Sequence, residues 1–267
     1  QLRSPAAKPH DADDDLVALQ DDPRFVKALQ GNGERIALSG LIQRSVSGGV
    51  TINRPVIMFS FSVPIEDGPG FGRGASAILR RYHMEAPEGA LTIYRTSGGP
   101  WEPLTAELIS RDADAFAGIP SEGGVSIRAH YRGGGTNQVG EASAYAVDIE
   151  YVRFEDGDGW RSIQLCFPCE DAGHPEELMQ RFLAYAERVP YETGRCGLAL
   201  LSARSDYGGA LGAAEWGEQI SARFHGFHPS MRWLTLVGPS SLERAGGAGM
   251  LSALIPDAHI TSTANGG

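Results

Sequence analysis

The sequence predicts an α+β fold in which helices cover one face of a mainly antiparallel, twisted sheet. Strand-like segments rich in β-branched and aromatic residues occur in both halves, helix-like segments follow them, and three strand-like segments joined by turns lie between. The 267 residues, 42% of them hydrophobic, can bury a sizeable core. We therefore expect a flexible N-terminal arm over residues 1–15 and a single α+β domain over 16–267. The return of strand, helix and strand would also fit two related halves, although no residue-level repeat accompanies it.

Capping residues and apolar runs define the elements expected in the first part of the chain. Asp22 as N-cap, Pro23 at the first helical position and Gly31 as a stop predict a short helix. The run after residue 50 is rich in β-branched and aromatic residues, which favour strands. The expected elements are a helix over 22–31, one long strand or two short strands over 50–64, a glycine-rich loop over 66–74, a helix over 75–86, and a turn and strand within 87–99.

A three-stranded antiparallel meander is expected next, with strands in 125–132, 142–154 and 160–167. The middle strand alternates, so its side chains should form two faces. One face carries Tyr145, Val147, Ile149 and Tyr151, and the other carries Ala146, Asp148 and Glu150. We expect the first face to be buried and the second to be partly wet.

The last part of the chain begins with the clearest helix signal. Leu178, Phe182 and Tyr185 recur at helical spacing, Pro175 lies near the start and Pro190 lies past the end. The elements expected after this helix are a strand over 197–203, a helix over 213–224, a strand over 232–238 and a short helix over 240–246.

Charge and cysteine content bear on partners and location. The formal net charge is -10, with 33 acidic against 23 basic residues, which argues against direct nucleic-acid binding and favours a basic partner. No run reaches the roughly 20 apolar residues of a membrane span, so no membrane contact is expected. Three cysteines do not make a disulfide framework, and we expect a cytoplasmic protein.

The pair Cys166 and Cys169 in CFPC has the spacing of a redox or metal-binding cysteine pair. A thiol-disulfide oxidoreductase remains the alternative function, although the expected helix starts too far away, near Pro175, to stabilise a thiolate at Cys166. A zinc site would need two more ligands; Cys196 is the only other cysteine, and His174 is the histidine nearest in sequence. We expect no metal.

Other motifs give no stronger indication of catalysis. Residues 68–75, GPGFGRGA, formally match a dinucleotide loop, but the following strand lacks the acidic residue that would bind ribose, which favours a plain connection. His225 and His228 flank a turn and are expected to be structural. No serine lies in a nucleophile motif. We therefore expect neither a catalytic site nor a cofactor.

Four short motifs follow one another in the last third: a G-x-x-G strand, an R-[YF]-x-G-[LF] turn, a W-L-T-x-[LV]-G strand and a closing glycine pair. The residues that match them are Gly194 and Gly197; Arg223, Phe224, Gly226 and Phe227; Trp233, Leu234, Thr235 and Gly238; and Gly246 and Gly247. With residues 59–68 and 80–104, they resemble the type VI secretion immunity protein family, over roughly residues 35–260. We interpret the glycines as residues of tight turns or close backbone approach and Trp233 as a buried packing residue.

This resemblance implies a non-enzymatic inhibitor that binds a nuclease-type effector toxin, of the VRR-Nuc or restriction-endonuclease-like kind. Such toxins carry basic clefts for nucleic acid, which an acidic protein can attract and occlude. The residues that we expect to bind the effector lie in two acidic loops: Glu66 and Asp67, and Glu155, Asp156 and Asp158 with Trp160. Solvated hairpin turns are the alternative reading of both loops.

Overall fold

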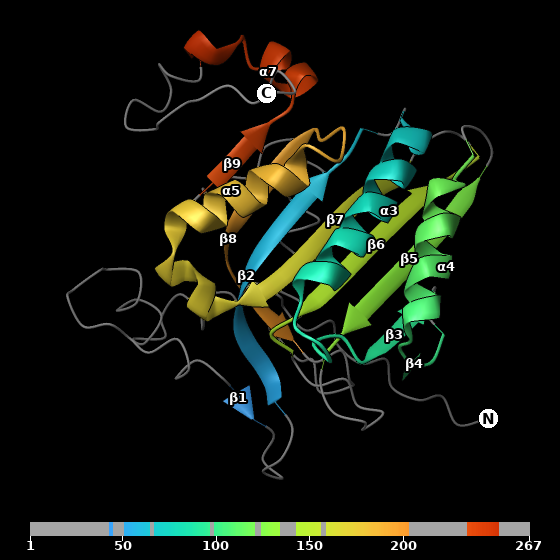
Figure 1. The fold of residues 1–267 in the computed structure, drawn as a ribbon. Coiled ribbons are helices and arrows are strands. Elements are labelled where there is room, and N and C mark those ends of the chain that lie inside the picture. Colours follow the sequence, from blue (N-terminus) through green and yellow to red (C-terminus); the bar gives the residue numbers. More distant parts are fainter. Residues whose placement is uncertain are drawn as a thin grey trace, which may run out of the picture.

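The structure, a computed structural model, describes residues 43–44, 51–64, 67–96, 99–120, 124–133, 143–155, 159–202 and 234–250. These residues form one sheet with helices (Figure 1). The strands are β1 (Gln43–Arg44), β2 (Thr51–Ser62), β3 (Ile93–Thr96), β4 (Glu102–Pro103), β5 (Val125–Arg132), β6 (Ala146–Arg153), β7 (Gly159–Pro168), β8 (Thr193–Ser202) and β9 (Leu234–Val237). The helices are α3 (Gly68–Glu85), α4 (Ala106–Ala117), α5 (Pro175–Ala186), α7 (Pro239–Arg244) and a 3-10 helix (Cys169–Gly173).

The sheet has the strand order β4-β3-β5-β6-β7-β2-β8-β9, with β1 paired to β2 off this path. Every strand pair in the described residues is antiparallel. Figure 1 shows α3, α4 and α5 side by side on one face of the sheet. The predicted α+β class is therefore confirmed, including the helices on one face.

The main core lies between the sheet and these three helices. Aromatic rings fill it: Phe59 of β2 lies 4.8 Å from Phe167 of β7 and 5.1 Å from Phe182 of α5, measured between ring centroids. Tyr82 of α3 lies 5.1 Å from Phe167 by the same measure. All four side chains are 4% exposed or less. The core thus joins segments separated by more than a hundred residues.

The meander has the predicted faces. Val147, Ile149 and Tyr151 of β6 are fully buried on the helix side. Tyr145, just before β6, packs against the same core but is only half-buried. Glu150 on the opposite side is half-buried. Asp148 on that same side is only 8% exposed, so this face is more buried than expected. We call the sheet side away from α3, α4 and α5 the opposite face.

The glycine-rich segment 66–74 was predicted as a loop, and this is wrong from Gly68 onward because α3 already begins there. The Asp67 carboxylate caps the helix by accepting from the Gly70 amide at 2.7 Å. A Cβ on Gly72 would collide with the Phe116 carbonyl oxygen of α4. The glycines therefore allow close packing of α3 instead of forming a phosphate loop, which removes the basis for the dinucleotide reading.

Helix α4 was missed, although its sequence carries the usual signals. The Thr105 hydroxyl accepts from the Leu108 amide at 3.3 Å, and Gly118 follows the last turn. Ile109, Ala113 and Phe116 form its buried stripe. The predicted helices over 22–31 and 213–224 and the arm over 1–15 lie outside the described residues.

Candidate functional site

The described acidic residues of the two predicted loops, Asp67 and Glu155, lie at the same end of the sheet. α3 starts over the end of β6, because a Cβ on Gly68 would lie 2.7 Å from the Tyr151 hydroxyl. The turn that contains Glu155 follows β6 directly, and Glu155 is exposed. Asp67, at the α3 cap, is half-buried. We call this region, defined by Asp67, Phe154 and Glu155, the acidic end; Glu66, Asp156 and Asp158 lie outside the described residues.

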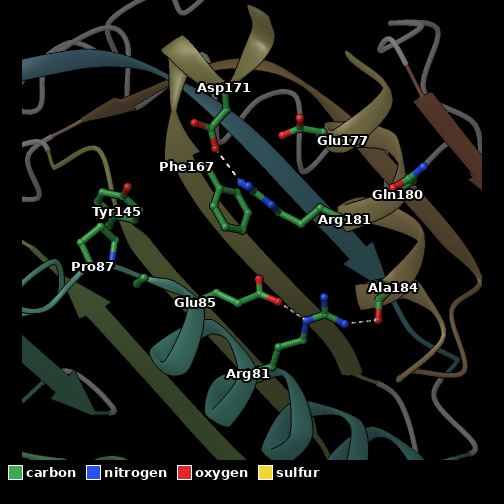
Figure 2. Close-up of a pocket in the computed structure, with 11 residues that line it drawn as sticks. Arg81, Glu85, Pro87, Tyr145, Phe167, Asp171, Glu177, Gln180, Arg181 and Ala184 are labelled. Atoms are coloured by element: carbon green, nitrogen blue, oxygen red, sulfur yellow. Dashed lines mark hydrogen bonds and ion pairs between the residues drawn. The ribbon is translucent and has the colours of Figure 1, made fainter. Parts of the chain in front are cut away.

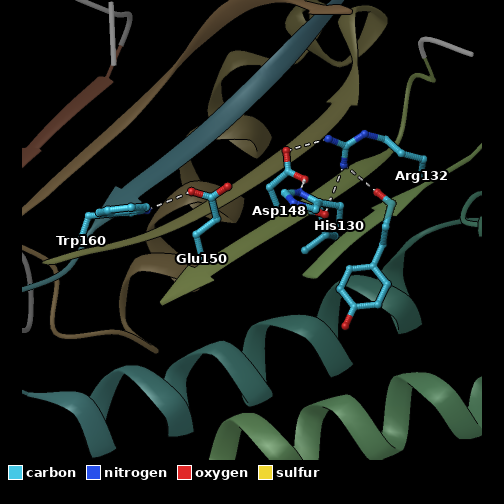
Figure 3. Close-up of polar contacts among 7 residues, drawn as sticks. His130, Arg132, Asp148, Glu150 and Trp160 are labelled. Atoms are coloured by element: carbon cyan, nitrogen blue, oxygen red, sulfur yellow. Dashed lines mark hydrogen bonds and ion pairs between the residues drawn. The ribbon is translucent and has the colours of Figure 1, made fainter. Parts of the chain in front are cut away.

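Trp160 lies beside the acidic end but on the opposite face of the sheet. Its indole Nε1 donates to Glu150 at 3.1 Å (Figure 3). The Arg128 guanidinium lies over the Trp160 ring, 5.1 Å from the ring centroid. Phe154, 49% exposed, meets the Trp160 ring edge-on at 5.9 Å between centroids. An exposed aromatic ring is thus present beside Glu155, an arrangement that the sequence did not indicate.

A buried ion-paired cluster occupies the opposite face between β5 and β6. Asp148 lies 2.6 Å from Nδ1 of His130 and accepts from Nη2 of Arg132 at 2.7 Å (Figure 3). Arg132 also donates to the backbone carbonyl oxygens of Tyr131 and Val147 at 2.9 and 3.3 Å. All three residues are less than a tenth exposed. Because the cluster is buried and satisfied internally, we interpret it as structural.

The CFPC cysteines are buried and occupy different environments. Cys166 packs on the opposite face with Val56, Ala146 and Leu201, while its neighbour Phe167 faces the helices. Cys169 belongs to the 3-10 helix, where burial, with a smaller contribution from Glu170, raises the pKa of its thiol. A redox cysteine needs a lowered pKa, so this environment disfavours a reactive thiolate.

A groove separates the C-terminal part of α3 from α5 and the 3-10 helix (Figure 2). It has a volume of about 590 Å³. Its lining includes Arg81, Glu85, Phe167, Asp171, Glu177 and Arg181. We call this space the α3–α5 groove. The sequence did not indicate it, since local patterns show the Arg81 and Glu85 pair on one helix but not the approach of α5.

Both guanidiniums in the α3–α5 groove are held in place. Arg81 donates to Glu85 at 2.5 Å and to the Ala184 carbonyl oxygen at 3.3 Å, and it lies over the Tyr185 ring. Arg181 donates to Asp171 at 2.6 Å. Its guanidinium lies 5.3 Å from the Phe167 ring centroid. Figure 2 shows Asp171 and Glu177 on one side of the groove and Glu85 on the other.

The motif glycines that the structure describes have packing or backbone roles. Gly194 is enclosed by Phe61 and Leu236, and a Cβ there would come within 3.2 Å of both. Gly197 is buried in β8. Gly246 and Gly247 end α7 with φ values of 85° and 86°, which only glycine adopts readily. Arg223, Gly226 and Trp233 lie outside the described residues.

Gly238 links the start of α7 to the segment that leads from α5 into β8. Its amide donates to the Glu192 carbonyl oxygen at 2.8 Å, and a Cβ there would collide with the Tyr191 carbonyl oxygen.

None of the helices in the described part of the chain combines the length and apolar character that a membrane crossing requires.

Comparison with known proteins gives a structural likeness but no sequence family. No family model and no curated protein matches the sequence. Among solved structures, the Pseudomonas aeruginosa T6SS protein PA0821, a type VI secretion system protein, matches with a TM-score of 0.57 and 19% identity. The match covers 80% of this chain and 64% of that chain, so this chain spans less than two thirds of its neighbour. The chain thus shares its fold with a protein of the type VI secretion system.

Proposed function

We propose that this chain is an immunity protein that binds and neutralises a cognate type VI secretion effector. The observation that carries the proposal is the fold likeness to a T6SS protein over 80% of the chain. The motifs around Gly194, Trp233 and Gly246 support the same role through their resemblance to the immunity family. The protein acts in the cytoplasm as a non-enzymatic inhibitor, and it protects the producing cell from its own toxin and that of its siblings.

The partner that fits best is a DNA-cleaving nuclease with a basic cleft. The chain carries a net charge of -10, so long-range attraction would speed encounter with a basic surface. At the acidic end, exposed Glu155 stands beside the half-exposed ring of Phe154. A charged rim next to an aromatic anchor is typical of protein interfaces. We therefore propose the acidic end, with Asp156 and Asp158, as a contact surface for the effector.

The proposed partner is an effector toxin encoded beside this gene, and its binding and inhibition test the function. The purified wild-type chain should bind that toxin and suppress its DNA cleavage in a nicking assay. If the wild-type chain neither binds nor inhibits it, the proposed function is wrong. If it binds but the toxin does not cleave DNA, the immunity role stands and the nuclease assignment fails.

The double variant Glu155→Gln/Asp158→Asn tests the surface. It should weaken binding by about tenfold, a loss of ~1.4 kcal/mol, measured by calorimetry. The control Glu107→Gln/Glu243→Gln also removes two negative charges, but at exposed positions of α4 and α7. Equal weakening in both variants would indicate a general charge effect and would remove the acidic end as the specific interface.

A further inference from the structure

The α3–α5 groove carries more negative than positive charge. Its lining contains three carboxylates, those of Glu85, Asp171 and Glu177, against the two guanidiniums of Arg81 and Arg181. The Glu177 side chain is 74% exposed, and its Oε1 lies 3.9 Å from Nδ1 of His174. Exposed Glu170 and Glu176 flank the groove in sequence. The unbalanced charge of this region is therefore negative.

The two arginines do not make the groove an anion site, because each already has a carboxylate partner. Arg81 and Glu85 form an i,i+4 pair at 2.5 Å, and Arg181 pairs with Asp171 at 2.6 Å. An incoming anion would have to compete with these carboxylates and would also face Glu177. An incoming cation could bind the Glu177 carboxylate and Oδ1 of Asp171, the oxygen that Arg181 does not contact, without displacing either guanidinium.

The shape of the groove also suits a side chain from another protein. Its volume of about 590 Å³ lies within the range of roughly 300–1,000 Å³ found for binding sites. The stacked arginines are fixed on Tyr185 and Phe167, so the walls are ordered before any partner arrives. Side-chain exposures of 24% for Arg81 and 34% for Arg181 show that both still reach solvent.

We infer that the α3–α5 groove receives an arginine or lysine side chain that projects from a basic protein partner. The inference rests on the proposed function for the identity of that partner, the effector, but not for the chemistry of the groove. Glu177 and Asp171 accept from the incoming cation on one side, and Glu85 lies across the groove from them. The groove is thus a second contact, separate from the acidic end.

Short peptides test the chemistry of the groove without the effector. The probe is the capped peptide Gly-Arg-Arg-Gly, compared with its citrulline and glutamate counterparts, and the readout is the NMR shifts of the Arg81 and Arg181 Nε–H groups in the full chain. The arginine peptide should shift these signals. The double variant Glu170→Gln/Glu177→Gln should reduce its affinity by about fivefold, a loss of ~1 kcal/mol, whereas Glu107→Gln/Glu243→Gln should not.

Three peptide results would overturn the inference. Equal shifts with the citrulline peptide would show that charge is not recognised. Stronger binding of the glutamate peptide would assign an anion site, and unchanged affinity in Glu170→Gln/Glu177→Gln would place the peptide elsewhere.

The neighbouring toxin separates the two proposals. If it binds the wild-type chain and Glu170→Gln/Glu177→Gln equally, the groove is not a contact and the immunity function stands. If the toxin does not bind the wild-type chain while the peptide results hold, the immunity function fails and the cation-binding groove stands.

Discussion

Single residues in this protein act mainly through burial and pairing, and Asp148 is the clearest case. It holds both His130 and Arg132 on the opposite face, within 2.7 Å, and it is 8% exposed. The sequence predicted that Asp148 faces away from the helices. It could not predict the burial, because the partners come from the neighbouring strand 16 and 18 residues away.

Replacing Asp148 with Ala should destabilise the fold strongly. The change leaves the Arg132 guanidinium buried without its carboxylate, which typically costs about 3–5 kcal/mol. Urea unfolding measures the loss. The control is Asp114→Asn, which breaks the exposed pair with Arg80 and should cost less than about 1 kcal/mol. Similar costs for both variants would show that the buried cluster contributes little.

Cys196 predicts how stability depends on pH. Its side chain is fully buried, and burial raises the pKa of its thiol to about 12, against about 8.5 for a free cysteine. The folded state therefore keeps a proton that the unfolded chain loses as pH rises. The contribution to stability is complete below about pH 8.5 and is lost progressively towards pH 12.

The comparison of wild type with Cys196→Ala isolates this effect, because buried tyrosines titrate in both proteins. The difference in unfolding free energy between the two proteins should shrink by up to about 1.4 kcal/mol per pH unit above roughly pH 9. Urea unfolding at pH values between about 7 and 10 measures it. A difference that stays constant over this range would contradict the assigned thiol environment.

At the scale of elements, α3 depends on its glycines for close packing against α4 and against the chain that follows α5. Gly72 faces the Phe116 carbonyl oxygen, and Gly74 faces the Arg188 carbonyl oxygen after α5. Both lie in the first half of a helix where alanine would have the higher intrinsic propensity. Close approach of two backbones therefore outweighs local helix preference here.

The variant Gly72→Ala should consequently destabilise the protein, by about 1–3 kcal/mol, instead of stabilising it as helix propensity alone would suggest. Thermal unfolding monitored by circular dichroism measures the change. Arg73→Ala, at the exposed neighbouring position of α3, should have an effect within about 0.5 kcal/mol. Stabilisation by Gly72→Ala would mean that α3 and α4 are packed less closely than described.

Element boundaries follow local signals where caps and prolines are present. α5 begins at the predicted Pro175, and α3 ends at Glu85 because Pro87 forces Ala86 into an extended conformation. The predicted strand over 125–132 has the bounds of β5. The glycine-rich start of α3 misled the prediction, since glycine normally marks a loop and only the neighbouring helix explains its use here.

At the scale of the whole molecule, the charge of -10 predicts that association with the proposed effector, if its surface is basic, depends on salt. The association rate should fall by about tenfold or more between roughly 0.01 and 0.15 M ionic strength, and the dissociation rate should change much less. Stopped-flow or surface-based kinetics with the toxin encoded beside the gene measures both. An association rate that does not respond to salt would contradict electrostatic steering.

Local sequence patterns were sufficient to predict the fold class, the meander with its two faces, the bounds of β5 and the start of α5. These depend on dihedral preferences and side-chain periodicity, which act over a few residues. Three features emerge only from the folded chain: β2 lies between β7 and β8, Asp67 and Glu155 share one end of the sheet, and α3 and α5 enclose a groove. Such placements depend on which distant surfaces bury one another. Arg81 and Ala184, for example, are 103 positions apart in the sequence, and no local pattern around either residue predicts their hydrogen bond.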